Sequence, residues 1–411
     1  MENRDFIITS LQSWDIEIGS TIKNTALEIS RKNRVLYVNP PMDHMTWIRE
    51  KRTSSYIYRM DVIKKRKSIL RRINQNMWVV DCPFMVYSIN RLPFSWLFDF
   101  FNYLNNKKIA NQILQTIRML KFSHYIHLID NDIYRSQYLK ELIKPDLSIY
   151  YCRDFVIGRN YWKKNGTRLE PLLAANSDMV LTNSTYFAER FKLFNQHTFA
   201  LETGVNLSLY DHTKKWVFPD DIQNISHPII GYTGAINSVR LDCDLLFNLA
   251  IHRPNYNFVF VGPEDDVFAK HNLHNLNNVY FLGKKAVETL PSYIKAFDVC
   301  INPQILNEIT DGNYPLKIDE YLAMGKPTIA TSTHTMRDIF NEYTYLPKNE
   351  KEYLQALDNA VSETNSQQKT KARIAFAHTH SWENSVKKIY QFINTVSNNE
   401  FISPQTNNKE K

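Results

Sequence analysis

The sequence predicts an α/β protein of two domains, each built around a mainly parallel, doubly wound sheet. Short apolar segments of strand length alternate with helical patterns through most of the chain, and such alternation is typical of parallel βαβ units. The alternation lapses once, over residues 207–227, and then restarts. A length of 411 residues suits two or three domains, and the 43% of hydrophobic and 22% of charged residues are ordinary for a globular protein.

The first domain is predicted over residues 1–206. A helix is expected over 21–30, and helical sequence separates the later strands. The segment 207–227 mixes polar and aromatic residues with Pro219, and we expect it to be a linker. The strands are expected at residues 6–9, 35–38, 77–80, 125–128, 148–151 and 179–181.

The second domain is predicted over residues 228–380, with a repeat of the same alternation. An amphipathic segment at 381–396 is expected to form a final helix that crosses back to the first domain. The polar segment 397–411 is expected to be a disordered tail. Strands are expected at 228–232, 258–261, 279–281, 299–301 and 328–330, and helices at 242–251, 290–296 and 318–323.

Cysteine usage and hydropathy limit the class of protein. The four cysteines are far apart and never in metal-ligand spacing, which argues against a disulfide scaffold or a structural zinc site and favours a reducing compartment. No apolar stretch approaches 18 residues, so no transmembrane helix is expected. The N-terminal segment is too acidic and too short in apolar length for a signal peptide, and we expect a cytoplasmic protein.

Charge is distributed unevenly between the two halves. Residues 1–200 contain 30 basic and 18 acidic side chains, a net charge of +12, whereas the remainder contains 20 basic and 24 acidic ones. Such asymmetry suggests an anionic partner for the first domain, either a membrane surface or a nucleic acid. The densest basic patch consists of Lys64, Lys65, Arg66, Lys67, Arg71 and Arg72. Two interpretations of this patch are equally consistent with the sequence: a solvated loop and a membrane contact.

An aromatic segment at 92–104 adds a second possible membrane contact. Helical spacing places Trp96, Phe100 and Tyr103 on one face, which suits an interfacial position on a membrane. A core helix of the first domain is the other interpretation, because aromatic residues dominate protein cores.

Several enzyme classes lose support because their motifs are missing. The sequence has no GxGxxG after a strand, no GxxxxGK[ST], no HExxH, no GxSxG and no protein-kinase set. These absences argue against nicotinamide dehydrogenases, P-loop NTPases, zinc proteases and α/β-hydrolases.

Two segments of the second domain suggest a phosphate-binding site. Gly231 and Gly234 close a strand and, we expect, open a helix, so that backbone amides approach a ligand; a simple tight turn explains them as well. Arg240 follows a few residues later. Its side chain either neutralises a bound phosphate or only precedes the next helix without a role in binding. In the segment 310–327, Lys317 stands in a first helical turn, where a cation opposes the helix dipole unless an anion lies nearby. Glu320, one turn later, could accept hydrogen bonds from ribose hydroxyls, although an ordinary amphipathic helix is also consistent.

These and other segments resemble the retaining GT-B glycosyltransferases of the family 4-like group. In the second half, PLK at 315–317, EYLA at 320–323 and GKP at 325–327 resemble the group's donor-site segment. GYTG at 231–234, VGP at 261–263, NVYFLG at 278–283 and AFDV at 296–299 follow the same order. In the first half, LTNS at 181–184 and ETGVN at 202–206 resemble two further pieces, and YYCRD at 150–154 resembles a strand of the cell-surface polysaccharide branch.

The resemblance implies the GT-B fold, two Rossmann-like domains that face each other across a cleft, and transfer of a sugar from a UDP- or GDP-sugar to a polysaccharide or lipid-linked acceptor. The transfer is expected to be retaining and to need no buried carboxylate pair. Backbone amides and cations are expected to stabilise the departing diphosphate. The expected catalytic residues are Lys317, Arg240, His127 and Asp130, and the expected donor-binding residues are Gly19, Ser20, Gly231, Gly234, Asp311, Gly312, Asn313, Tyr314, Pro315, Leu316 and Glu320.

The sequence departs from the group's pattern at one prominent position. The group commonly has two glutamates eight positions apart; Glu320 matches the second, but Gly312 stands at the first, so Asp311 or the turn amides are expected to hold the donor sugar. The triplet at 130–132 reads as DxD, yet no metal and no cofactor is predicted. The rival interpretations are a sugar-nucleotide epimerase or phosphorylase on the same fold, or a basic nucleic-acid-binding protein. We expect no nucleic-acid partner, because no recognition module is present.

Overall fold

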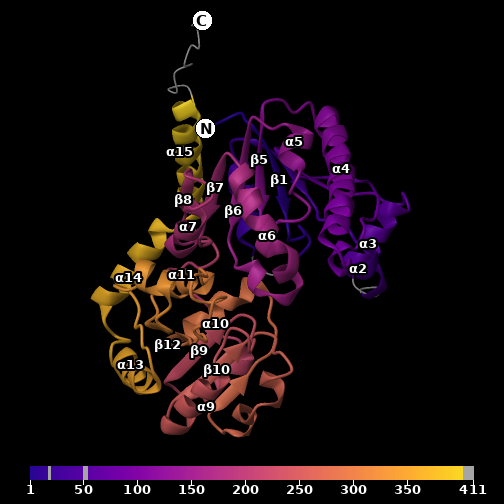
Figure 1. The fold of residues 1–411 in the computed structure, drawn as a ribbon. Helices are drawn as coiled ribbons and strands as arrows, with labels where there is room; N and C mark the ends of the chain where they lie inside the picture. Colours follow the sequence, from indigo (N-terminus) through magenta and orange to yellow (C-terminus); the bar gives the residue numbers. More distant parts are fainter. Residues whose placement is uncertain (17–19, 50–53, 401–411) are drawn as a thin grey trace, which may run out of the picture. The chain divides into compact units, whose positions relative to one another are not determined.

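The computed structural model describes residues 1–16, 20–49 and 54–400, and the chain divides into two compact units (Figure 1). Unit 1 comprises residues 1–183 and 187–201 together with the chain from residue 386 onward. Unit 2 comprises residues 184–186 and 202–385. Each unit contains a sheet whose strands are mostly or entirely parallel, so the α/β class predicted from the alternation of strands and helices is confirmed.

The sheet of unit 1 has eight strands in the order β3-β4-β2-β1-β5-β6-β7-β8. Only the β3–β4 pair is antiparallel among the pairs of this sheet. At its centre Ile7 pairs with Leu36 on one side and with His127 on the other. The strands are β1 (Asp5–Ser10), β2 (Arg34–Val38), β3 (Leu70–Asn74), β4 (Met77–Val80), β5 (Tyr125–Asp130), β6 (Leu147–Cys152), β7 (Met179–Thr182) and β8 (Thr198–Ala200).

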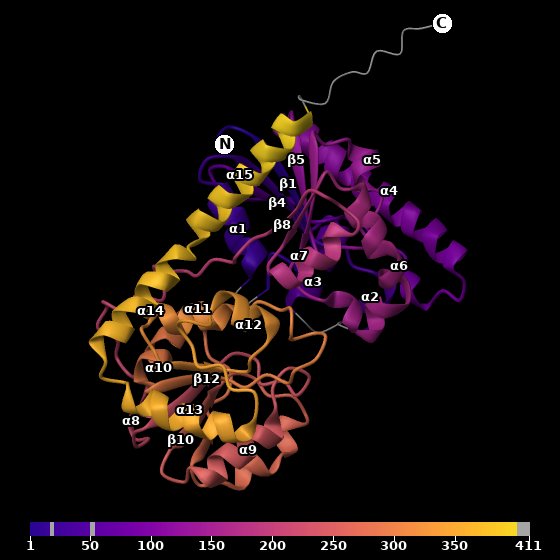
Figure 2. The ribbon, with the colours of Figure 1, turned by 60° about the vertical axis from the view of Figure 1, so that its left-hand side comes forward.

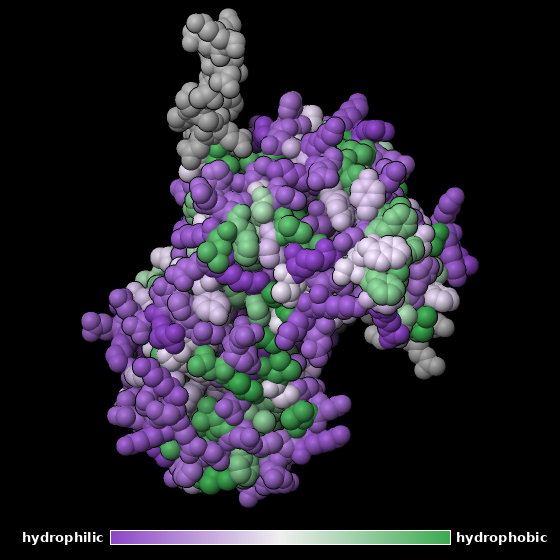
Figure 3. Space-filling view, in the orientation of Figure 1, coloured by the Kyte–Doolittle hydropathy of each residue, from purple (hydrophilic) through white to green (hydrophobic). Residues whose placement is uncertain are grey.

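Helices cover both faces of this sheet because successive side chains of a strand point to opposite faces. Phe6 and Ile8 pack in one core with α1 (Thr21–Ile29) and α15 (Trp382–Glu400), whereas Ile7 packs in another with α4 (Ser95–Leu120) and α5 (Leu139–Ile143) (Figure 2). The outer face of α4 leaves aromatic side chains exposed (Figure 3). The other helices of this part of the chain are α2 (His44–Arg49), α3 (Ser54–Ile63), α6 (Asn160–Asn176) and α7 (Thr185–Lys192).

The sheet of unit 2 has five parallel strands in the order β11-β10-β9-β12-β13, with β9 at the centre. The strands are β9 (Ile229–Thr233), β10 (Asn257–Val261), β11 (Val279–Phe281), β12 (Val299–Asn302) and β13 (Thr328–Ala330). One face packs against α10 (Leu290–Ala296) and α11 (Leu316–Ala323), and the other against α9 (Cys243–His252) and α13 (Glu350–Ser362). Shorter or peripheral helices are α8 (Asp220–Gln223), α12 (His334–Ile339) and α14 (Gln367–Thr379).

All the predicted strands form, and the structure adds β3 and β8. Strand β3 (LRRIN) is a polar edge strand with no apolar alternation, and β8 has three residues, so neither gives a clear sequence signal. The segment 207–227 packs into unit 2 instead of connecting loosely, because Tyr210 and Ile222 are buried in its core. The helix predicted over 242–251 is confirmed as α9, which begins at Cys243. A loop lies between β9 and α9, so the expectation that Gly234 opens a helix was wrong.

The last helix joins the two units along the chain. It was expected over 381–396 but α15 continues to residue 400, so the tail predicted from 397 was wrong over its first four residues; residues 401–411 lie outside the described part. Its first turn belongs to unit 2, and Val386, Ile389 and Ile393 pack in the core of unit 1. In the described residues, no helix has both the length and the apolar character needed to cross a membrane.

Candidate functional site

Lys317 lies at the start of α11, where it meets the carboxyl end of β9. Its Nζ donates a 2.5 Å hydrogen bond to the Tyr232 hydroxyl and lies 4.1 Å from the centroid of the same ring. The Tyr232 hydroxyl in turn donates to the Ala235 carbonyl at 2.9 Å. The ammonium is therefore held at the edge of the sheet where ligands of doubly wound folds usually bind.

Two glycines let the loop after β9 come close to this ammonium. Gly234 has a φ of +125°, and a Cβ added there would lie 3.1 Å from Lys317 Nζ. A Cβ on Gly262 would lie 1.8 Å from the Gly234 carbonyl oxygen, so only glycine permits this approach of the two backbones. The prediction that Gly234 contributes to a phosphate-binding loop remains a prediction, and the loop now has Lys317 as its neighbour.

Gly231, in contrast, is required for packing inside unit 2. A Cβ there would lie 2.0 Å from the Phe297 ring, far inside van der Waals contact. Gly231 is buried, and Phe297 is 1% exposed. This placement accounts for the first glycine of the motif without any ligand.

The surroundings of Lys317 favour binding of an anion. Burial and, second to it, the positive charge of Arg240 lower the pKa of Lys317 to about 7, although the charge of Glu320 acts in the opposite direction. Pro315 occupies the N-cap position of α11 and provides no side-chain cap. The Ile318 amide donates to the Pro315 carbonyl at 2.9 Å, whereas the amides that precede it in the first turn have no acceptor within the helix. Two cations and uncapped helix amides at one place are the features of a phosphate site.

Glu320 lies one turn further along α11 and is hydrogen-bonded to Tyr210 in the segment 207–227, which was expected to be a linker. Burial raises the pKa of Glu320 to about 7, whereas a hydrogen bond from Tyr210 and the charge of Lys317 lower it. The Tyr210 side chain is 3% exposed. The structure thus brings Gly234, Arg240, Lys317 and Glu320 together at one edge of unit 2.

The turn that precedes α11 is fixed by bonds within unit 2. Asp311 Oδ1 accepts the amide of His334 at 2.6 Å, at the start of α12. The Gly312 carbonyl accepts the Ser184 hydroxyl at 2.7 Å, and the Asn313 amide donates to the Thr310 carbonyl at 3.2 Å. The carboxylate of Asp311 therefore already has a structural partner, and its predicted role in holding the donor sugar stays a prediction.

Tyr314 points into the core of unit 2, and with it comes a buried network that the sequence did not predict. Its hydroxyl donates to Asp319 Oδ2 at 2.6 Å, and His380 Nδ1 lies 2.8 Å from Asp319 Oδ1. Tyr314 is 4% exposed, and Asp319 is fully buried. Leu316 packs partly against the same core. These hydrogen bonds hold the buried side of α11 in the core of unit 2. The position of the helix in turn determines the direction in which Lys317 and Glu320 point.

The predicted site residues of the first domain belong to unit 1. Ser20 is the N-cap of α1: its hydroxyl oxygen accepts the Lys23 amide at 3.5 Å and its hydroxyl donates to Gln12 at 2.5 Å. Gly19, also predicted to bind the donor, lies outside the described residues. A small pocket in this unit lies beside the loops that follow β2 and β4, and it is lined by Pro40, Pro41, Met42, Arg59, Ile63, Asp81 and Cys82.

His127 is enclosed in the sheet of unit 1. It is 0% exposed, and its Nε2 lies 3.0 Å from the Thr9 hydroxyl. Burial lowers its pKa to about 3, so the ring is neutral at physiological pH. This environment favours a structural role for His127 over the predicted catalytic one.

Asp130 is also fully buried, at the carboxyl end of β5. The Arg153 guanidinium donates two hydrogen bonds to its carboxylate, that from Nη2 at 2.8 Å, and the Ser10 hydroxyl donates a third at 2.6 Å. Asp132 pairs with Arg135 at 3.0 Å. Because both carboxylates of the DxD triplet have cationic partners, they offer little to a metal ion.

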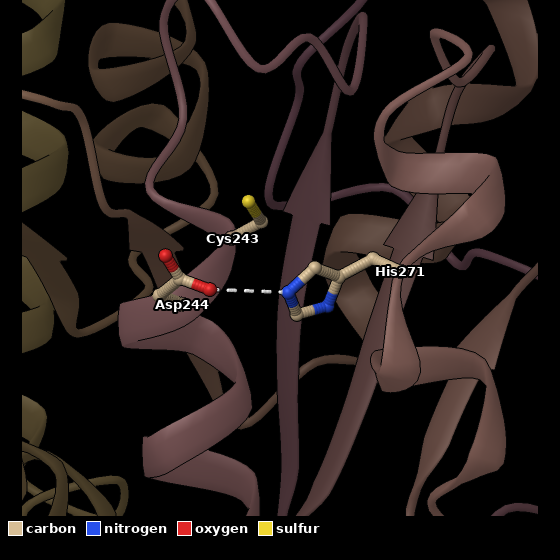
Figure 4. Close-up of side chains that lie close together, drawn as sticks. All are labelled: Cys243, Asp244 and His271. Atoms are coloured by element: carbon tan, nitrogen blue, oxygen red, sulfur yellow. Dashed lines mark hydrogen bonds and ion pairs between the residues drawn. The ribbon is translucent and has the colours of Figure 1, made fainter.

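One further cluster in the described residues has the composition of a metal site. Cys243 and Asp244 begin α9, and His271 stands between η3 (Phe268–Lys270) and η4 (Asn272–Asn275) (Figure 4). His271 Nδ1 accepts the Leu273 amide at 3.2 Å, so Nε2 carries the ring proton and donates to Asp244 at 3.2 Å. Burial raises the pKa of the Cys243 thiol. These features favour hydrogen bonding at the start of α9 over coordination of a metal ion. The prediction that the protein binds no metal stays a prediction.

Sequence reasoning missed Tyr232, Tyr210 and His380. Tyr232 lies inside the 231–234 motif, where its position next to a predicted phosphate loop was an available signal. Tyr210 and His380 contact α11 only through long-range packing, and no local pattern marks them.

Comparisons with known proteins bear on the fold and on the class of protein. Residues 227–363 match the family model described as glycosyl transferases group 1. The Bacillus subtilis (strain 168) protein TuaH, named as a teichuronic acid biosynthesis glycosyltransferase, is 22% identical over 273 residues, which cover 62% of this chain and 68% of TuaH.

Solved structures match over nearly the whole chain. Anabaena HepE in complex with UDP is 12% identical, with a TM-score of 0.64, and the match covers 95% of this chain and 100% of HepE. Sucrose-phosphate synthase from Thermosynechococcus elongatus is 14% identical, with a TM-score of 0.66, and the match covers 97% and 100% of the two chains. At this identity the solved structures establish the fold, whereas the family model and TuaH bear on the activity. Together they show that residues 227–363 are similar to glycosyl transferases group 1 and that the chain has the two-domain fold of the GT-B glycosyltransferases.

Proposed function

We propose that the protein transfers a sugar, with retention of configuration, from a nucleoside-diphosphate donor to a glycan or lipid-linked acceptor in the assembly of a surface polysaccharide. The observation that carries the proposal is the convergence of Lys317, Arg240 and the uncapped start of α11 at the edge of unit 2. The name of TuaH supports a polysaccharide product, and the HepE complexes with UDP and UDP-glucose support a uridine nucleotide. UDP is therefore the first candidate and GDP the second.

The chemistry of the transfer defines the role of each group. When the bond between the anomeric carbon and the diphosphate breaks, negative charge develops on the departing phosphate oxygen. In this proposal Lys317, Arg240 and the amides at the start of α11 stabilise that charge. Glu320 accepts hydrogen bonds from the ribose hydroxyls, and Asp311 and Asn313 hold the sugar. Neither a metal nor an organic cofactor is part of the proposal.

Substitution of Lys317 tests the site directly. Lys317→Ala is expected to lower kcat/KM by on the order of 10²–10³-fold, because it removes a cation from the leaving group. Glu320→Ala is expected mainly to weaken nucleotide binding. The exposed Lys348→Ala is the matched control and should be unaffected. Near-wild-type kinetics for both site variants, with intact melting curves, would remove the site assignment.

A thermal-shift screen of nucleotides and nucleotide sugars identifies the donor. A ligand that binds only the folded state stabilises it, by about 2.7 kcal/mol at 100 times its Kd. The rival functions give different outcomes: an epimerase or phosphorylase would convert the sugar without the acceptor, and a nucleic-acid-binding protein would bind labelled duplex in moderate salt in place of UDP or GDP.

The proposal also includes a location at the inner face of the cell membrane, where a lipid-linked acceptor is available. The net charge of +12 in residues 1–200 supports this location, because anionic lipids attract basic surfaces.

A further inference from the structure

The basic cluster at 64–72 is largely engaged inside unit 1. Arg71 pairs with Asp15 at 2.8 Å and with Asp81 at 3.1 Å, and Arg66 and Lys67 lie within 4 Å of Asp61. Arg72 donates to the carbonyls of Asn74 and Gln75 in the β3–β4 turn. The cluster therefore stabilises the edge of the sheet, and only part of its charge is available to a partner.

A different surface of unit 1 combines large exposed apolar side chains with exposed cations. On α4, Trp96 is 67% exposed and Phe100 is 55% exposed, and Phe94 just before the helix is 57% exposed. Tyr103 and Lys107 continue the same face of α4, because positions 96, 100, 103 and 107 follow the helical repeat. Figure 3 shows green and near-white side chains gathered over α4 and α2, with purple ones around them. We call this the aromatic surface; its exposed apolar members are Trp47, Ile48, Tyr87, Phe94, Trp96, Phe100, Tyr103 and Tyr161.

Contacts between neighbouring elements make the aromatic surface continuous. The Tyr87 ring lies 5.0 Å from that of Phe101 on α4 and 6.4 Å from His44 on α2. Asn90 donates to the Tyr161 carbonyl at 2.5 Å, and Lys164 donates to the Leu92 carbonyl at 3.1 Å, which joins α6 to the start of α4. The surface thus depends on three segments of unit 1, at 44–48, 87–108 and 159–168.

Charge identifies the kind of partner. Asp99 is the one acid within these three segments, and it pairs with Arg168 at 2.7 Å. Asp43 directly precedes the first segment and accepts the amides of Met45 and Thr46. Protein interfaces are depleted in lysine, whereas surfaces that bind anionic lipid place Lys and Arg around Trp, Tyr and Phe. The exposed cations are Arg91, Lys107, Lys108, Arg159, Lys163 and Lys164.

We propose that the aromatic surface docks unit 1 on a membrane that contains anionic lipids, with Trp96, Phe100 and Phe94 inserted at the headgroup level. The surrounding lysines and arginines contact the lipid phosphates. This inference names the surface for the location given in the proposed function, but it does not depend on the identity of the donor or on the residues around Lys317.

The test is flotation of the full chain with vesicles of phosphatidylcholine alone or of phosphatidylcholine with 40% phosphatidylglycerol. The wild type should bind the anionic vesicles and dissociate as NaCl rises from 50 to 500 mM. The variant Lys107→Gln, Lys108→Gln, Lys163→Gln, Lys164→Gln should bind on the order of 10²–10³-fold more weakly, from the usual contribution per basic residue. The matched control changes four exposed lysines of unit 2, Lys270, Lys348, Lys351 and Lys371, to Gln and should bind as the wild type does.

A second variant, Trp96→Ser with Phe100→Ser, separates insertion from charge attraction. It should lose most binding, whereas Val217→Ser with Val267→Ser, at exposed positions of unit 2, should not. Thermal stabilisation by UDP, measured on the same preparations, should be equal in all variants, so failure of docking and failure of the donor site can be told apart. Equal binding to the two vesicle types, or equal binding by the lysine variant and its control, would overturn the proposal. The proposal would also be overturned if the wild type bound no anionic vesicles but formed a dimer that Trp96→Ser with Phe100→Ser converts to a monomer, because the aromatic surface would then be an interface between two copies of the chain.

Discussion

Protonation of Lys317 is expected to be coupled to nucleotide binding. With a pKa of about 7 in the free protein, roughly 10% of Lys317 carries a charge at pH 8. A diphosphate within about 4–6 Å raises the pKa of a lysine by about 1–3 units, because it favours the charged form. If the bound form has a pKa of about 9 or 10, binding at pH 8 takes up about 0.8–0.9 proton per nucleotide.

The same numbers predict the pH dependence of affinity. The ligand binds the protonated amine, and the protonated fraction falls as pH rises through 7, so binding weakens in the alkaline direction. Between pH 7 and pH 9 the affinity should fall roughly 20- to 50-fold. The terminal phosphate of the nucleotide has its own pKa near 6 and is mostly ionised over this range.

Isothermal titration of UDP at pH 8, in HEPES and in Tris, measures proton uptake from the difference in buffer ionisation enthalpy. Lys317→Arg is the decisive control, because arginine stays charged and should bind UDP with no uptake from this position. Glu320 titrates in the same range, and Glu320→Gln removes its contribution. The coupling between Lys317 and nucleotide binding would be refuted by an uptake below about 0.2 proton per UDP in the Glu320→Gln protein. It would also be refuted if the affinity for UDP changed with pH in the same way in the wild type and in Lys317→Arg.

Three further predictions concern stability. The folded-state pKa of Glu320, about 7, lies above its ordinary value, so the wild type should lose stability as pH rises from about 4.5 through 7, by up to ~3 kcal/mol. Glu320→Gln should remove that loss, and parallel melting curves of the two proteins at pH 5 and pH 8 would contradict it. Gly231→Ala should lower the free energy of unfolding by about 1–3 kcal/mol through its clash with Phe297. UDP affinity of the folded protein should be unchanged, and a selective loss of affinity would instead place Gly231 at the ligand. Asp319→Ala should cost about 3–5 kcal/mol in urea unfolding because it leaves His380 and Tyr314 without their acceptor. The exposed Asp244→Ala should cost little, and equal losses for the two would disprove an anchoring role for Asp319.

The sequence by itself determined the α/β class, the two sheets and the segment that carries the candidate site. These depend on local information: apolar runs such as that of β10, glycines in turns, and proline before α11, all of which act within a few residues. The resemblance of the 315–327 segment to a known group depended on the same local spacing, and the family match over 227–363 agrees with it. Strand β3 gave no such signal, because an edge strand needs only one partner and tolerates polar residues.

Only the tertiary structure decided what each polar residue does. Lys317 and Asp319 stand two positions apart, yet one reaches Tyr232 at the sheet edge and the other pairs with His380 in the core. His127 and Asp130 looked like site residues from their position after a strand, but both are enclosed in unit 1, one against Thr9 and the other against Arg153. A basic run in the sequence became the edge of a sheet, while exposed lysines from separate segments surround the aromatic surface. The physical reason is that burial and ion pairing depend on residues far apart in the chain, and these long-range neighbours set the charge state and accessibility on which function depends.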